Sequence, residues 1–329
     1  MSNEMLTLIT DSLRALLEQK CTPHLLREYE SSFLTQELWA EFEALGFTDL
    51  LLPEQDGGAE LDLADLFELI FLFGKYLLPV PLSDTIVARA LLQKAGKPLP
   101  AGAIVLASVA SGEQAATVPV MYAKTAQYAL IEQAQKAALV ELEASQLQPC
   151  GVDRSLTASI PVQAIKFEYS PAFAVSFEVI TAALRAAEMA GMVARVLELS
   201  VEYVNERSQF GKKIARFQAV QQQIAVLAEE AAAARMAAKM AFASEDFQMI
   251  SAATAKMRAG NAAKTSVAIA HAVHGAMGFS EEYDLQLYSR RLIEARLSYG
   301  SDSYWAKKLG VARMKSAGQG SLDFVLVNY

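Results

Sequence analysis

Residues 207–218 read RSQFGKKIARFQ and carry four cationic side chains, those of Arg207, Lys212, Lys213 and Arg216. The chain as a whole is acidic, with a formal net charge of -8 at pH 7, so this cluster departs from the composition around it. One interpretation is the solvated start of a helix decorated with charge. The alternative is a site for a phosphorylated ligand, because guanidinium and ammonium groups form charge-assisted hydrogen bonds with phosphate oxygens.

The bulk composition indicates a globular protein with a substantial core. The chain has 329 residues, of which 53% are hydrophobic, which is enough for about two domains. Its acidic balance argues against a nucleic-acid partner, because phosphate contacts need a basic face. Cys21 and Cys150 lie far apart and lack metal-ligand spacing, so we expect reduced thiols in a cytosolic protein.

No segment has the pattern of a membrane span or a signal peptide. The most apolar stretch, LFELIFLFGKYLLPVPL (66–82), is interrupted by Glu68 and Lys75 and contains prolines. The N-terminus lacks a basic region followed by an unbroken apolar run. We therefore expect a soluble, cytoplasmic protein without a membrane partner.

Three regions with different sequence patterns follow one another along the chain. Residues 1–98 have helical periodicity, with Gly46 as a helix stop and Asp62 or Asp65 as a helix cap. Residues 99–171 contain short apolar and β-branched segments, ending with AIKFEYS (164–170), which predict five to seven short, mostly antiparallel strands. We expect an N-terminal helical domain followed by a reduced β-sheet domain.

Residues 172–329 return to helical periodicity. The pattern predicts long helices near 174–206, 215–243, 248–276 and 280–297, with a shorter one after Ser301. Four such helices predict an up-and-down bundle. The predicted fold class is mainly α, with a small β middle domain and a C-terminal four-helix bundle.

Four motifs in order along the chain resemble those of one enzyme family. The opening segment matches R-x-x-F-G-x-x-I-x-x-F-Q. WAEFEALGFTDLLLPEQDGG (39–58), AVHGAMGFSEEYDLQLYSRR (272–291) and YGSDSYWAKKLG (299–310) match its other conserved segments at fitting intervals. The chain therefore resembles the acyl-CoA dehydrogenase family. The resemblance implies FAD bound between bundle helices at a subunit interface, and hence an oligomer.

The resemblance also gives the opening cluster a role at the FAD of a neighbouring subunit. Arg207 would contact the pyrophosphate, where a guanidinium binds most strongly. Gly211 would allow a tight turn, and Phe210 and Phe217 would offer apolar faces to the adenosine part. Gln218 would supply an amide donor or acceptor. For Lys212, Lys213 and Arg216, solvated side chains remain an equal alternative.

The segment HAVHGAMGF (271–279) resembles a family segment that approaches the flavin pyrophosphate. Gly275 keeps the pattern, whereas Ala272 replaces the usual glutamine and Ala276 a glycine. One hydrogen bond to FAD is therefore lost, and the methyl group of Ala276 limits how closely FAD can approach the backbone. His271 and His274 have no Cys or carboxylate partner nearby in the sequence, so we expect no metal site.

The segment YGSDSYW (299–305) matches family positions that contact FAD phosphates, at Gly300, Ser301 and Ser303. The alternative is that Ser301 or Asp302 only caps a helix. The family usually carries its catalytic glutamate immediately before this glycine, where the present sequence has Tyr299.

No other position in the sequence offers a clear candidate for the catalytic base. A phenol with a pKa near 10 is a poor base at pH 7. The second family position for the glutamate falls at about Thr181, and Glu178 is the nearest carboxylate, although a solvated helix start also explains it. Residues 101–170 contain nothing that resembles the segments lining the flavin ring in the family.

Two functions follow from the resemblance. The first is an FAD-dependent acyl-CoA dehydrogenase that converts an acyl-CoA thioester into a 2-enoyl-CoA and passes electrons to an electron-transfer flavoprotein. The alternative is a non-catalytic or half-site subunit, similar to the shorter chains of two-component acyl-CoA dehydrogenases acting on steroid-type side chains. There a companion chain would supply the base. Either function implies a homo- or hetero-oligomer, arranged as a dimer of dimers.

Overall fold

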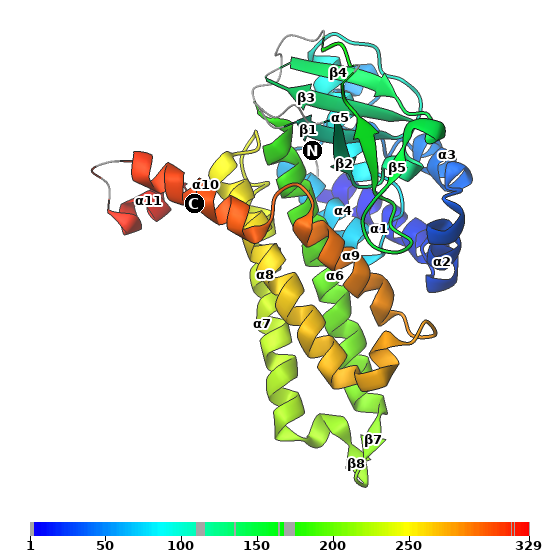
Figure 1. Cartoon of the computed structure of the whole chain (residues 1–329), viewed down its shortest axis with the longest axis vertical. Helices are drawn as coiled ribbons and strands as arrows, with labels where there is room; N and C mark the ends of the chain where they lie inside the picture. The colour runs from blue at the N-terminus through cyan, green and yellow to red at the C-terminus, as the bar shows by residue number, and fades with distance from the viewer. Residues whose placement is uncertain are drawn as a thin grey trace. The chain divides into compact units, whose positions relative to one another are not determined.

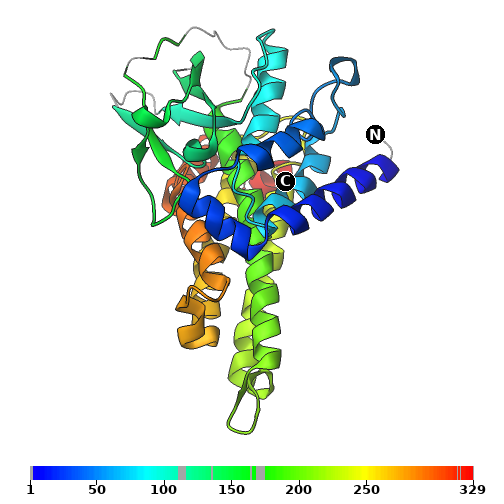
Figure 2. The same cartoon turned by 90° about the vertical axis from the view of Figure 1, so that its right-hand side faces the viewer.

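The computed structural model describes residues 3–109, 116–134, 136–163, 165–167, 175–316, 318 and 320–328 (Figures 1 and 2). The chain forms two compact units. One contains Met1–Leu69 and Leu78–Leu184, and the other contains Ile70–Leu77 and Arg185–Tyr329. The residues of α4 (Leu63–Lys75) and α6 (Phe177–Glu206) are shared between the two units.

The first unit begins with helices whose ends follow from the sequence. They are α1 (Asn3–Lys20), α2 (Pro23–Ser32), α3 (Gln36–Ala44), the first part of α4, and α5 (Leu82–Lys94). Gly46 lies after α3 with φ of 74°, and its N–H donates to the carbonyl of Glu43 at 3.0 Å. The carboxylate of Asp62 accepts from the Asp65 N–H at 2.7 Å at the start of α4. The predicted helix stop and cap are confirmed, with Asp62 as the capping residue.

Two small sheets complete the first unit. One has the strand order β1 (Ile104–Val109), β3 (Tyr128–Gln133), β4 (Lys136–Glu141), and the other β2 (Thr117–Val120), β6 (Ala158–Pro161), β5 (Gln148–Pro149). β1 pairs with β3 in parallel, whereas the other pairs in these two sheets are antiparallel. Short, mostly antiparallel strands are thus confirmed for the described residues. The predicted strand at 164–170 lies largely outside those residues, and the boundary predicted at 171–172 lies wholly outside them.

The second unit holds the helices predicted from residue 172 onward, except for the start of α6 up to Leu184, which belongs to the first unit. They are α6, α7 (Gln218–Met240), α8 (Met249–His274), α9 (Leu285–Leu297), α10 (Asp302–Lys315) and α11 (Ser321–Asn328). α7 and α8 run side by side and pack through buried alanines (Figure 1). The mainly α fold with a small β region and a C-terminal helical region is therefore confirmed. No helix among the described residues is long and apolar enough to cross a membrane.

Candidate cofactor-binding site

A β-hairpin with a two-residue turn contains the centre of the basic motif. β7 (Ser208–Gln209) pairs antiparallel with β8 (Lys212–Lys213), and Phe210 and Gly211 form the turn with φ of 51° and 77°. Glycine adopts this left-handed conformation freely, whereas at Phe210 it costs about 1–3 kcal/mol. The Phe210 ring is 91% exposed. The hairpin therefore holds a strained residue with its apolar ring in water, which core packing does not explain.

The two lysines of the motif have contacts within the motif itself. Lys213 Nζ donates to the Glu206 carbonyl at 2.6 Å, at the negative end of the α6 dipole. Lys212 Nζ lies 4.3 Å from the centroid of the Phe217 ring, which in turn meets the Phe210 ring edge-on at 6.2 Å. Both lysines are nevertheless exposed. Their contacts stabilise the hairpin and leave Arg207 as the basic side chain nearest the hollow beside it.

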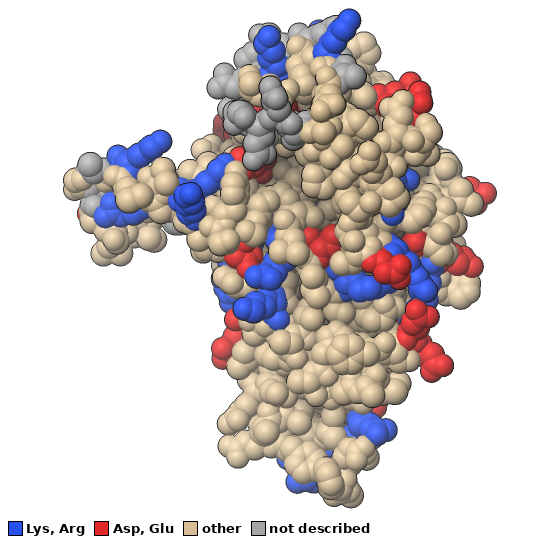
Figure 3. Space-filling model, viewed as in Figure 1, with Lys and Arg blue, Asp and Glu red and all other residues tan. Residues whose placement is uncertain are grey.

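A pocket of about 480 Å³ opens beside the hairpin. Four residues predicted from the motifs line it together, namely Arg207, Phe210, Phe217 and Gly275. Gly211 follows Phe210 in the turn, and Gln218 begins α7 and is exposed. Small patches of Lys and Arg atoms lie near the β7–β8 hairpin, among residues of other kinds (Figure 3). The remaining lining residues are Tyr203, Gln209, Ile214, Val220, Gln223, Ala272, Val273, His274, Ala276 and Met277.

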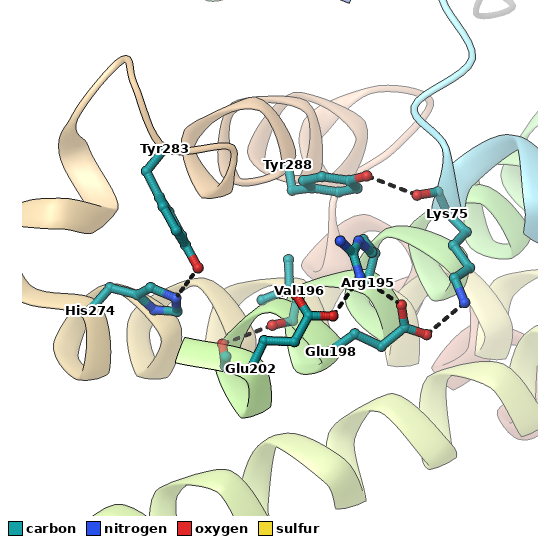
Figure 4. A network of polar contacts seen from close by, with 9 residues as sticks. Lys75, Arg195, Val196, Glu198, Glu202, His274, Tyr283 and Tyr288 are labelled. Carbon is teal, nitrogen blue, oxygen red and sulfur yellow. Dashed lines mark hydrogen bonds and ion pairs between the residues drawn. The ribbon is translucent and has the colours of Figure 1, made fainter. Parts of the chain in front are cut away.

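His274 forms a neutral, rigid part of the pocket wall. Its Nδ1 lies 2.7 Å from the Ala270 carbonyl, which can only accept, so Nδ1 carries the proton. Nε2 then accepts from the Tyr283 hydroxyl at 3.3 Å (Figure 4), and the Tyr203 ring stacks on the imidazole at 4.3 Å. Burial lowers the pKa of His274 below its usual value and raises the pKa of Tyr283 to about 12. Both side chains are therefore uncharged at neutral pH.

The hydrogen bonds of His274 leave neither ring nitrogen available for a metal ion. Its Nδ1 donates to a carbonyl and its Nε2 accepts from a phenol, so both ring nitrogens are in use. Within the described part of the chain, no group of three or more His, Cys, Asp or Glu side chains is placed to hold a metal ion.

An ion-pair network fixes α6, which carries Tyr203 and ends one residue before Arg207 (Figure 4). Lys75, at the end of α4, pairs with Glu198 at 2.6 Å, and Arg195 bonds both Glu198 and Glu202 at 3.0 and 3.1 Å. The Tyr288 hydroxyl of α9 donates to the Lys75 carbonyl at 2.9 Å. These contacts tie three helices together within the second unit, so α6 is held firmly up to the hairpin.

The second predicted phosphate contact lies in the connection from α9 to α10. Tyr299 and Gly300 both have positive φ, at 53° and 90°. The Ser301 hydroxyl accepts from the Tyr304 N–H at 3.4 Å and lies 3.1 Å from the Ser303 hydroxyl. Ser301 therefore caps α10, as the capping interpretation predicts. Its contact with a phosphate stays a prediction.

The conformation of this connection is imposed by its surroundings. A Cβ atom on Gly300 would come within 2.6 Å of Trp305 Nε1, so only glycine fits there. Trp305 Nε1 donates to the Tyr299 carbonyl at 2.9 Å. Lys256 Nζ donates to the carbonyls of Arg296 and Gly300 at 3.0 and 3.1 Å. Sequence analysis missed Lys256, because the sequence does not distinguish it from Lys264, the exposed lysine of the same alanine-rich helix.

The side chains at the positions considered for a catalytic base make other contacts or lie in the other unit. The Tyr299 ring lies 5.9 Å from the guanidinium carbon of Arg185, a fully buried residue that pairs with Glu188 at 3.1 Å. The Thr181 hydroxyl donates to the Phe177 carbonyl at 2.7 Å, as a helical threonine commonly does. Glu178 lies half-buried in the first turn of α6, in the first unit, whereas Tyr299 belongs to the second. The buried Arg185–Glu188 pair was also missed, although its i,i+3 spacing within an apolar helix was visible.

The two predicted phosphate contacts lie beside different parts of α8. Asp302 packs on Gly260, where an added Cβ would lie 2.0 Å from its Oδ1 atom, so Ser301 lies beside this segment. Gly275, at the far end of α8, lines the Arg207 pocket. The fifteen residues from Gly260 to Gly275, at 1.5 Å per residue, span roughly 22 Å. One chain therefore does not bring Arg207 and Ser301 together around one diphosphate.

Comparison with known proteins identifies the family. The family model described as "Acyl-CoA dehydrogenase, C-terminal domain" matches residues 179–306, and "Acyl-CoA dehydrogenase, N-terminal domain" matches residues 3–97. The chain belongs to the acyl-CoA dehydrogenase family. The opening motif at 207–218 and the predicted cofactor-binding residues from Arg207 to Ser303 all lie inside the first match, whereas Glu178 lies one residue before it.

One relative and two solved structures add three further likenesses. The chain is 30% identical to acyl-CoA dehydrogenase IpdE2 of Mycolicibacterium smegmatis over 86% of its length and 91% of the relative. Its fold resembles that in the crystal structure of the ChsE4-ChsE5 complex from Mycobacterium tuberculosis, with a TM-score of 0.80, 20% identity and coverage of 97% and 99%. It also resembles the Tcur3481-Tcur3483 steroid ACAD, with a TM-score of 0.83, 23% identity and coverage of 96% and 99%. At these identities the structural matches show the fold alone.

Proposed function

We propose that this acyl-CoA dehydrogenase family chain is a half-site subunit. It binds FAD across a subunit interface and takes part in the α,β-dehydrogenation of an acyl-CoA with a companion chain that supplies the base. The proposal depends on one observation: a tyrosine, Tyr299, stands at the position where the family usually has its catalytic glutamate. Tyr299 stands there beside the guanidinium of Arg185, in a left-handed turn. The names of the structural relatives, a ChsE4-ChsE5 complex and a steroid ACAD of two components, support a heteromeric assembly and a bulky acyl group.

The residues of the pocket fit the adenosine diphosphate end of FAD. Arg207 offers a guanidinium that can bind a diphosphate through two parallel hydrogen bonds. The exposed ring of Phe210 and the Phe217 ring offer apolar faces, and the neutral His274 adds no competing charge. The roughly 480 Å³ hollow holds only part of a dinucleotide, which supports a ligand completed by another subunit. Ser301 and Ser303, which lie away from this pocket, would donate hydroxyl hydrogen bonds to FAD phosphates at a separate place on this chain.

The division of labour follows from the chemistry of the side chains. When bound, FAD supplies the hydride acceptor, so the protein must position the thioester and remove the α-proton. A phenol at its usual pKa near 10 is protonated at pH 7 and cannot accept that proton efficiently. The lack of a general base typically slows such a step by roughly 10²–10⁴-fold. A carboxylate of the companion chain would restore this rate, while Arg207 and the α10 serines would hold the phosphates.

The test is to purify the chain alone and with a co-expressed companion from the same family. Visible spectra and dye reduction with an acyl-CoA report flavin binding and turnover. We expect both only from the co-expressed pair. A yellow single chain that reduces the dye would instead support a self-sufficient acyl-CoA dehydrogenase, the activity that the name of its 30% identical relative carries. An electron-transfer flavoprotein can then replace the dye as the acceptor.

A matched pair of variants locates the flavin contact. Arg207→Ala should lower the FAD content of the pair at least tenfold, because a charge-assisted bond to a phosphate is lost. Arg216→Ala removes an equally exposed cation of the same cluster that does not line the pocket. Equal FAD content in both variants would contradict the role proposed for Arg207.

A further inference from the structure

The connection between α9 and α10 is held from its buried side by two side chains. Lys256 Nζ donates to the carbonyls of Arg296 and Gly300, and Trp305 Nε1 donates to that of Tyr299. Lys256 is only 1% exposed and Trp305 is fully buried. Three carbonyls of one short segment are therefore turned toward the interior and satisfied there. The left-handed conformation of Tyr299 depends on these contacts, because such a backbone is costly for a residue other than glycine.

This arrangement determines where Ser301 and Ser303 lie. Ser301 caps α10 directly after the held segment, and its hydroxyl lies 3.1 Å from that of Ser303. If Gly300 rotated, the cap and the spacing of the two hydroxyls would change with it. The amine that holds Gly300 therefore acts on the hydroxyls through the backbone.

We propose that Lys256 is a positioning residue that holds the 296–301 connection so that Ser301 and Ser303 face a bound diphosphate. The inference rests on the proposed function, because it concerns the proposed binding of FAD. Lys256 does not touch the ligand itself, since it is buried beneath the connection. A plain packing role would not account for a lysine here, because an apolar side chain fills such a space without the cost of burying an amine.

The charges around Lys256 give the proposal a second readout. Arg185 on α6 and Arg296 on α9 repel a charged amine, whereas Asp302 on α10 attracts it. Burial is the largest effect, and the pKa of Lys256 falls from 10.5 to about 7. A diphosphate above the connection would favour the charged amine. The affinity for FAD should therefore be higher below pH 7 and fall as the pH rises through about 7.

The experiment compares Lys256→Met with Lys264→Met, which removes an exposed lysine of the same helix. FAD binding to the chain with its companion is titrated by flavin fluorescence between pH 6 and 9. Amide hydrogen exchange of residues 296–304 is measured on the flavin-free protein. We expect Lys256→Met to weaken FAD binding by about tenfold at pH 6 and to remove the fall in affinity near pH 7. Exchange should become faster in 296–304, while Lys264→Met behaves as wild type.

The outcomes separate this inference from the proposed function. If Arg207→Ala loses FAD but Lys256→Met keeps wild-type affinity and pH dependence, the flavin site stands and the role of Lys256 is overturned. If wild type binds no FAD with any companion, the proposed function and this inference both fail. If Lys256→Met does not fold, Lys256→Gln retains a donor amide and should give an intermediate affinity. Faster exchange with unchanged affinity for FAD would mark Lys256 as structural only and overturn the proposal.

Discussion

Phe210 shows at the scale of one residue how this chain departs from what stability alone would select. Glycine or asparagine would occupy its left-handed turn position at lower cost. A phenylalanine with a 91% exposed ring gains nothing from the core of its own chain. Strain of this kind persists at binding sites, where a residue must be presented in one orientation. We therefore expect the ring to contact a ligand or another subunit.

Lys256 gives a prediction about stability and pH. Its pKa is about 7 in the folded chain and near 10.5 when unfolded. Between these values the unfolded chain binds a proton that the folded chain does not, so the free energy of unfolding rises with pH across this window. Each pH unit contributes up to about 1.4 kcal/mol. From pH 7 to 9, wild type should gain about 2 kcal/mol relative to Lys256→Met.

Urea unfolding of both proteins at pH 7 and 9 measures this difference. Comparing the two proteins cancels the titration of the other tyrosines and lysines that they share. A difference that stays constant between the two pH values would mean that Lys256 is charged in the folded chain throughout.

At the scale of elements, the crossing of α4 and α6 depends on two glycines. A Cβ atom on Gly191 would lie 2.0 Å from the Phe71 carbonyl oxygen, and one on Gly74 would lie 1.9 Å from that of Glu188. Both neighbours are backbone atoms, so they cannot move aside as a side chain can. Gly191→Ala should therefore destabilise the chain by about 2–4 kcal/mol, because the helices must separate.

Thermal unfolding provides the measurement, with Gly310→Ala as the matched control. Gly310 also lies inside a helix, and an added Cβ there meets no atom within 4 Å. This control should raise stability by about 0.5–1 kcal/mol through helix propensity. A Gly191→Ala protein as stable as its control would show that the two helices pack less closely.

The elements were predictable where local rules decide them. Gly46 and Asp62 mark helix ends through bonds to their near neighbours in the sequence, and both predictions are confirmed. The motifs also selected residues that the fold brings into one pocket, such as Arg207 and Gly275. Lys256 could not be assigned in this way, because its partners lie about forty residues further along the chain. The parallel pairing of β1 with β3 likewise depends on tertiary packing and not on the strand pattern.

At the scale of the whole molecule, the two predicted phosphate contacts are separated by roughly 22 Å along α8, so we expect a ligand shared between subunits. Flavin bound at an interface stabilises the assembly, and the assembly in turn retains the flavin. Diluting the flavin-loaded complex should therefore release FAD in step with its dissociation into single chains. Light scattering and flavin fluorescence on the same dilution series measure both quantities. A 35.7 kDa monomer that keeps its flavin would contradict a shared site.

The bare phenyl ring at the hairpin tip also has a consequence for how the protein must be produced. In the proposed assembly, a copy without its partner keeps this exposed phenyl ring in water, next to a largely apolar pocket. Surplus copies can then associate tip to tip and precipitate. Balanced synthesis of both subunits would keep that surplus small.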